Sequence, residues 1–151
     1  MTHTFDTPIG AARLTEEDGS IIRIELTDAN APSSAPTPLL REAEHQIMAF
    51  LRGERRQLDF PILMVGTPFQ QRVWQALQQI PYGATRTYGE IATAIGSPRA
   101  SRAVGMACNK NPLLFIVPCH RVVGANGKLV GFAYGTEAKR WLLELESCAI
   151  L

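Results

Sequence analysis

The chain has 151 residues, of which 46% are hydrophobic and 19% charged, with 12 Gly, 10 Pro and a formal net charge of +1. This composition is typical of a globular protein and excludes collagen, coiled coils and disordered chains. Its longest apolar run, residues 113–117, is far short of the roughly 20 residues that a membrane helix needs, and residues 1–6 show no secretory signal. The cysteines have no C-x-x-C spacing, which predicts reduced thiols in a cytoplasmic protein.

The small net charge conceals an uneven distribution of charged residues. Residues 1–62 hold six Arg against ten Asp and Glu, whereas residues 63–151 hold nine Lys and Arg against four acidic residues. The basic second half fits a polyanionic partner and fits a solvated basic face equally well. We predict a small α/β domain over residues 1–62 and a second domain over residues 63–151.

The first domain is predicted to be a small sheet with one helix and no chemical motif. Its histidines, His3 and His45, lack the spacing of metal ligands. Alternating apolar residues, turn signals and helical spacing predict, in chain order, strands at 5–14 and 21–26, a loop at 30–38, a helix at 39–51 that ends at Gly53, and a strand at 57–60.

The second domain is predicted to be mainly helical. Thr67 and Pro68 are typical of a helix cap and a first helical position. The expected elements are helices at 68–80, 88–95 and 99–109, an apolar run at 113–117, a hairpin-type turn at 124–127 leading into 128–132, and a helix at 137–146.

The helices at 88–95 and 99–109 are joined by a short Gly-containing turn, as in a helix-turn-helix. The second of them combines small residues with Arg99, Arg102 and Lys110. Small residues would let this helix enter the minor groove of DNA, which is only about 6 Å wide, or would let it pack tightly on another helix. The basic neighbours favour DNA. Arg102 would fill the gap left by an extruded base, or would contact a phosphate.

The most specific motif is Pro118-Cys119-His120-Arg121. A thiol is nucleophilic as a thiolate, and a neighbouring His favours that form. Adjacent side chains of an extended segment point to opposite sides, so Cys119 and His120 are not expected to touch directly unless the backbone turns, and a bridging water molecule would carry the proton from Cys119 to His120 instead. The resulting imidazolium needs an orienting carboxylate, for which the candidates are Glu90, Glu144 and Glu146.

The alternative for such a dipeptide is a buried structural Cys beside a surface His. We assign a structural role to the other two thiols, with Cys108 in helix packing and Cys148 as a C-terminal thiol. Only Cys119 therefore carries the predicted chemistry.

Several motifs of the second domain resemble the O6-alkylguanine-DNA alkyltransferases, also called methylated-DNA–protein-cysteine methyltransferases. They are TYGEIA at 87–92, SRAVG at 101–105, NP at 111–112, IVPCHRVVG at 116–124 and KRWLLELE at 139–146. The resemblance is strong from about Phe69 onward and weak in the first domain. It implies an α/β N-terminal cap, with a small RNase H-like sheet plus helix, before a mainly α, winged-helix-like domain with a helix-turn-helix.

The resemblance implies DNA repair by direct, irreversible and stoichiometric transfer of the alkyl group of O6-alkylguanine to Cys119, with O4-alkylthymine left open. The implied partner is the minor groove of double-stranded DNA. The protein would need no cofactor and would act as a monomer, with cooperative binding along DNA left open. The alternatives are a non-catalytic lesion-binding protein, a helix-turn-helix regulator and a cysteine hydrolase.

The same resemblance implies a role for each site residue. Cys119 would be the acceptor, His120 its base through a water molecule and Glu146 the supporting carboxylate, while Tyr88 would rotate and bind the guanine and Asn111 would be a hinge. The implied substrate-binding residues are Val122 (through its backbone), Phe132, Ala133, Tyr134, Lys139 and Trp74. The implied DNA-binding residues are Arg102 as the intercalating finger, Ser101, Ala103, Gly105, Arg121 and Lys110.

The pocket loop departs from the family pattern. Many members have Gly-Tyr-x-Gly-Gly where this chain has GFAYG at 131–135. Phe132 lacks a hydroxyl, Ala133 offers only its backbone N–H, and Tyr134 places a ring where many members have Gly. We predict a tighter pocket that accepts methyl and disfavours benzyl groups. The first domain also lacks the Cys and His ligands of zinc-containing members, so we predict no metal.

Overall fold

The computed structural model describes residues 1–150, with side chains through Ser147, and the chain divides into two compact units. The first unit comprises Met1–Val65 and Pro112–Ile116, and the second comprises Gly66–Asn111 and the chain from Val117 onward. Residues 112–116, which we expected in the second domain, thus belong to the first unit. None of the described helices is long and apolar enough to cross a membrane.

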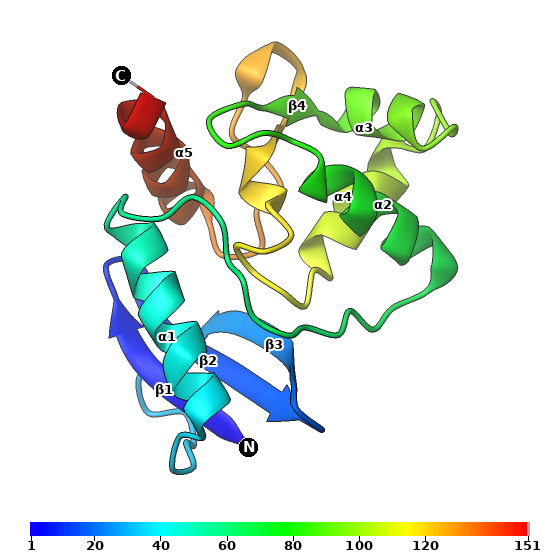
Figure 1. Cartoon of the computed structure of the whole chain (residues 1–151). Helices are drawn as coiled ribbons and strands as arrows, with labels where there is room; N and C mark the ends of the chain where they lie inside the picture. The colour runs from blue at the N-terminus through cyan, green and yellow to red at the C-terminus, as the bar shows by residue number, and fades with distance from the viewer. Residues whose placement is uncertain (151) are drawn as a thin grey trace. The chain divides into compact units, whose positions relative to one another are not determined.

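The first unit is a three-stranded antiparallel sheet with a helix across one face (Figure 1). Strands β1 (Thr2–Thr7), β2 (Gly10–Glu17) and β3 (Ser20–Thr27) pair in the order β1-β2-β3, and helix α1 spans Pro38–Leu51. Asp18 and Gly19 both have positive φ, as a tight hairpin turn between β2 and β3 requires. The helix and the sheet bury a shared apolar core of Ala12, Leu14, Ile21, Ile24, Leu40, Ala43, Ile47 and Phe50.

Two distant segments cover the outer edge of β3. The Ile21 N–H donates to the Pro61 carbonyl at 2.9 Å, and the Ile24 N–H donates to the Pro112 carbonyl at 2.8 Å. The strand expected at 57–60 is absent, so that prediction was wrong. Buried Gln46 explains the difference, because its amide accepts from the Asp59 N–H at 2.7 Å and donates to the Asp59 carbonyl at 3.1 Å, which satisfies both groups without a strand partner.

The second unit consists of short helices around one small parallel ladder. Its elements are α2 (Pro68–Gln78), β4 (Arg86–Thr87), α3 (Tyr88–Ala94), α4 (Ser101–Asn109), the 3₁₀ turn η1 (Cys119–Arg121), β5 (Val122–Val123), the 3₁₀ turn η2 (Ala125–Gly127) and α5 (Thr136–Ile150). The two helices of the predicted helix-turn-helix are α3 and α4, and they pack together in this unit.

Capping explains where these helices begin. Thr67 accepts from the Gln70 N–H while Gln70 accepts from the Thr67 N–H, and Thr87 and Glu90 repeat this capping box at α3. The helix start predicted at Thr67 is therefore confirmed. The expected hairpin is not found, because Val122–Val123 pairs in parallel with Arg86–Thr87 and residues 128–132 form no strand.

Candidate active site

The Pro118-Cys119-His120-Arg121 motif folds into a tight turn at the start of η1. Pro118 has φ −79° and ψ 65°, and the Cys119 N–H donates to the Val117 carbonyl at 2.8 Å, which is an inverse γ-turn. The backbone therefore turns at Cys119 and His120 and is not extended there, which is the alternative that the sequence left open. All three residues of η1 are buried, so the turn directs a thiol, an imidazole and a guanidinium into the interior of the second unit.

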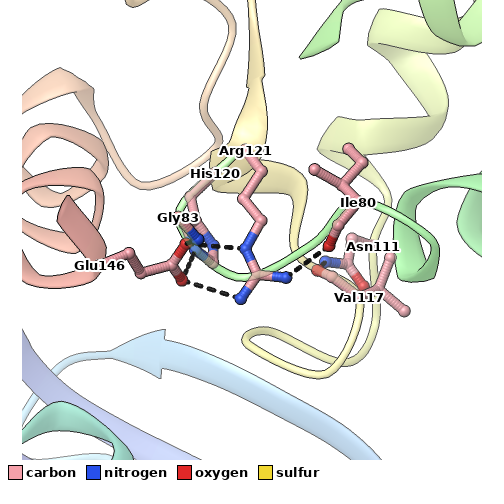
Figure 2. A network of polar contacts seen from close by, with 7 residues as sticks. All are labelled: Ile80, Gly83, Asn111, Val117, His120, Arg121 and Glu146. Carbon is pink, nitrogen blue, oxygen red and sulfur yellow. Dashed lines mark hydrogen bonds and ion pairs between the residues drawn. The ribbon is translucent and has the colours of Figure 1, made fainter. Parts of the chain in front are cut away.

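Glu146 of α5 joins two of these side chains (Figure 2). Its carboxylate lies 2.6 Å from His120 Nε2, and Arg121 donates to it from Nε at 2.8 Å and from Nη2 at 3.0 Å. The Gly83 N–H donates to the same carboxylate at 3.2 Å. Burial alone would raise the pKa of Glu146, but the hydrogen bonds from His120 and Arg121 hold that pKa at about 2. The carboxylate is therefore ionised at neutral pH.

The ionised carboxylate fixes the tautomer of His120. Glu146 can only accept, so His120 Nε2 carries the hydrogen and Nδ1 of the neutral ring carries a lone pair. Burial lowers the pKa of His120, although the bond to Glu146 partly opposes this, so the ring is neutral at pH 7. His120 Nδ1 has no hydrogen-bond partner among the described residues. This geometry presents a buried base.

Cys119 is held by the side chain of Asn111. The Asn111 amide donates to Cys119 Sγ at 3.2 Å and to the Val117 carbonyl at 2.8 Å. Burial raises the pKa of the Cys119 thiol, whereas the Asn111 hydrogen bond and the charge of Lys139 lower it. Cys119 as a whole is 4% exposed. The resting thiol is therefore protonated, and Asn111 and Lys139 are groups that would stabilise its thiolate.

Lys139 of α5 is fully buried, which is costly for a charged group. Its Nζ donates to the Val130 carbonyl at 2.9 Å and lies 5.8 Å from the ring centroid of Tyr88 and 5.9 Å from that of Phe132. Burial lowers the pKa of Lys139, and the neighbouring thiols partly oppose this. Burial raises the pKa of Tyr88 to about 12, so its hydroxyl is a neutral hydrogen-bond donor.

The predicted pocket loop lies beside these groups. Phe132 and Tyr134 are half-buried and pack edge to face with centroids 5.7 Å apart, while Ala133 is exposed. Val122 is fully buried in β5. The cation–π contact between Lys139 and the ring of Phe132 links this loop to the site. The role of each loop residue in binding a guanine stays a prediction.

The predicted DNA-binding residues of α4 and of its C-cap, Lys110, differ in exposure. Arg102 and Lys110 are exposed, and Ser101, Ala103 and Gly105 are half-buried. A Cβ at Gly105 would lie 3.8 Å from the Tyr88 ring, which is ordinary contact. Met106, which the sequence analysis did not single out, is 68% exposed on the same helix.

Two predicted ligand contacts need correction. Arg121, expected on DNA, is 7% exposed, and its guanidinium is used by Glu146 and by the Ile80 carbonyl at 2.9 Å. Trp74, expected in the substrate pocket, is 1% exposed and donates from Nε1 to the Ala107 carbonyl of α4 at 2.9 Å. Both side chains are thus hydrogen-bonded inside the second unit, Arg121 to Glu146 and the Ile80 carbonyl and Trp74 to the Ala107 carbonyl.

The structure distinguishes the three candidate carboxylates for His120 and describes the second thiol, Cys108. Glu90 serves the α3 capping box and Glu144 is exposed, so Glu146 is the carboxylate that the structure brings to His120. Cys108 is buried at the end of α4, and its burial and the nearby Cys119 raise its pKa to about 12. The side chain of Cys148 lies outside the described residues. The described part of the chain holds no cluster of three or more metal-ligating side chains.

Comparison with known proteins gives a consistent result. A family model described as 6-O-methylguanine DNA methyltransferase, DNA binding domain, matches residues 68–148. Methylated-DNA–protein-cysteine methyltransferases of Methanosarcina acetivorans and Bacillus subtilis are 46% and 44% identical, over 95% of this chain and 97% and 93% of theirs. The crystal structure of Mycobacterium tuberculosis OGT in complex with DNA matches with a TM-score of 0.89 and 45% identity, over 98% of this chain and 93% of that chain.

These similarities extend over both units and include the segment that carries the buried Cys119–His120–Glu146 array. The predicted small sheet with a helix, followed by a mainly helical second half, agrees with the fold of the matched structures. The chain belongs to the O6-methylguanine-DNA methyltransferase family.

Proposed function

We propose that the protein repairs DNA by moving the methyl group of O6-methylguanine to Sγ of Cys119, once per molecule. The observation that carries this proposal is the buried array in which ionised Glu146 holds neutral His120 with Nδ1 free to accept a proton. The names of the relatives, which specify methylated DNA and a protein cysteine, support the same reaction here.

In the proposed reaction, His120 Nδ1 takes the proton of the Cys119 thiol through a water molecule. Sγ attacks the methyl carbon, the carbon–oxygen bond breaks, and its electron pair goes to the guanine, which takes up the proton. The products are S-methylcysteine and an unmodified guanine. Because a thioether offers water no leaving group to displace, Cys119 is not regenerated and each molecule acts once.

The neighbouring residues would support this transfer without changing covalently. The Lys139 ammonium stabilises the thiolate, whose charge exists only after proton removal. Tyr88 stays protonated because of its high pKa, and since its one O–H donates to the Val130 carbonyl at 2.8 Å, its hydroxyl oxygen is left to accept a hydrogen bond from the guanine. Asn111 donates to Sγ and so orients the nucleophile.

The proposed DNA-binding element is α4, placed in the minor groove. Its half-buried small residues, Ser101, Ala103 and Gly105, support close approach to a narrow groove, and exposed Arg102 is the side chain that would replace an extruded base. The DNA in the matched mycobacterial structure supports a nucleic-acid partner. We further propose a monomer acting in the cytoplasm, with an RNase H-like first unit and a winged-helix-like second unit.

The test mixes the protein with a duplex that contains one O6-methylguanine and measures intact and peptide masses. The expected result is one added methyl on the Cys119 peptide, at most one per protein molecule, which is lost in Cys119→Ser and kept in the matched control Cys108→Ser. Lesion binding without transfer would indicate a damage sensor. Transfer by Cys119→Ser, or repeated turnover, would refute the acceptor mechanism.

A further inference from the structure

The main-chain carbonyl of Val130 joins two helices at the acceptor site. It accepts a hydrogen bond from the Tyr88 hydroxyl at 2.8 Å and one from Lys139 Nζ at 2.9 Å. Tyr88 begins α3 and Lys139 lies in α5, so the partners come from elements far apart in the chain. A carbonyl oxygen has two lone pairs, and both are used here.

The next residue, Gly131, is required by this arrangement for reasons of space. A Cβ added at Gly131 would lie 2.5 Å from the Tyr88 hydroxyl oxygen and 3.3 Å from the ring carbon that bears it. Gly131 also has φ +76°, a conformation that side chains disfavour. Any other residue at position 131 would displace either the Tyr88 hydroxyl or the loop itself. In either case the Val130 carbonyl would no longer be shared between Tyr88 and Lys139 in the same geometry.

The shared carbonyl matters most for Lys139. Its side chain is fully buried, and none of the carboxylates in the described part of the chain forms an ion pair with it. A lysine stem is flexible, so a fixed acceptor is needed to hold the ammonium in one place. The ammonium acts on the Cys119 thiol through space, and this effect depends on the separation of the two groups.

We propose that the Val130 carbonyl and Gly131 form a positioning element of the acceptor site. The carbonyl holds the Lys139 ammonium toward Cys119, and Gly131 leaves the space in which Tyr88 shares that carbonyl. The inference rests on the proposed function only in taking Cys119 as the reactive thiol.

The test measures carbamidomethylation of Cys119 by iodoacetamide as a function of pH, resolved by peptide mass and without DNA. For Gly131→Ala we expect a higher apparent pKa of Cys119 and a rate at pH 7.5 about tenfold lower, the change that one pKa unit produces in the thiolate fraction. The matched control is Gly127→Ala, because Gly127 has the same φ of +76° but nothing within 4 Å of an added Cβ. We expect the control to keep the wild-type profile.

Tyr88→Phe supplies a rescue. This substitution removes the hydroxyl oxygen with which an alanine side chain at position 131 would clash. The double variant Gly131→Ala, Tyr88→Phe should therefore have a rate of Cys119 carbamidomethylation within about twofold of that of Tyr88→Phe alone. A wild-type profile for Gly131→Ala, or an equal defect with and without the Tyr88 hydroxyl, would overturn the proposal.

Folding failure is informative as well. If Gly131→Ala does not fold, the proposal requires the double variant to fold and to match Tyr88→Phe, and an unfolded double variant would overturn it. Because iodoacetamide replaces the DNA substrate, a wild-type protein that reacts as expected here but takes no methyl from DNA would refute the proposed function and leave the positioning element intact.

Discussion

Replacing Glu146 with Gln would remove a buried negative charge while keeping the size of the side chain. The variant would leave the buried Arg121 guanidinium without its counter-charge and would free His120 to adopt the other tautomer. Breaking a buried ion pair from one side is strongly destabilising, because the remaining charge stays out of water. We therefore expect Glu146→Gln to lower the free energy of unfolding of the second unit.

The expected loss follows from the pKa of this carboxyl, about 2 in the folded protein against an ordinary 4.5. That gap corresponds to about 3 kcal/mol of stability. Because the folded-state pKa is the lower one, the stabilisation is fully present above about pH 4.5 and is lost as the pH falls toward about 2. Glu146→Gln should lack this contribution at neutral pH and should respond less to acid than the wild type.

Urea unfolding followed by tryptophan fluorescence is a suitable assay, because Trp74 and Trp141, the two tryptophans of the chain, both belong to the second unit. Titrations at pH 7 and at about pH 3.5 should separate the variants. Glu144→Gln is the matched control, since Glu144 is exposed on the same helix and its loss should cost no more than about 0.5 kcal/mol. Equal stabilities of the two variants at pH 7, or a wild-type acid response of Glu146→Gln, would refute the reasoning.

Three further outcomes are expected. Tyr134→Gly should raise the ratio of benzyl to methyl transfer rates, because it removes one ring of the Phe132–Tyr134 pair, and an unchanged ratio would contradict a tight pocket. Trp74→Phe should cost about 1 kcal/mol in unfolding followed by circular dichroism, since the Ala107 carbonyl loses its indole donor and keeps the longer bond from the Lys110 N–H at 3.2 Å, and should leave the transfer rate unchanged; a slower transfer would support the predicted substrate role of Trp74. Methylation of Cys119 should lower the melting temperature, because a group is added at a site only 4% exposed, and equal melting of free and methylated protein would disprove this.

Features encoded over a few residues were predictable from the sequence. Thr67 with Pro68 locates the start of α2, and the small and basic residues of 99–110 locate the helix proposed to bind DNA. The adjacent Cys119 and His120 likewise predict a nucleophilic thiol with a neighbouring base. The carboxylate was not predictable from the residues alone, because Glu90, Glu144 and Glu146 differ only in tertiary position, and the resemblance was needed to select Glu146.

Features that depend on distant partners escaped sequence reasoning. A basic residue next to a nucleophile predicts an exposed contact or a buried ion pair equally well, and Arg121 is the buried case because its partners lie at Ile80 and Glu146. The missing strand at 57–60 has the same cause, since the side chain of Gln46 satisfies Asp59 from a different element. Local propensity contains no information on such pairs.

Burial acts on each ionisable group of the acceptor site in the direction that disfavours charge. It raises the pKa of Cys119 and lowers the pKa values of His120 and Lys139, so the resting thiol and imidazole are neutral. Burial also raises the pKa of Glu146, but hydrogen bonds from His120 and Arg121 hold that pKa at about 2, so the carboxylate stays ionised and does not take the proton itself. In the proposed reaction, proton transfer from Cys119 to His120 would therefore create two charges that already have partners in place, the thiolate near Lys139 and the imidazolium against Glu146. Such partners favour the charged transition state over the neutral resting state, which is the condition for catalysis by preorganised electrostatics.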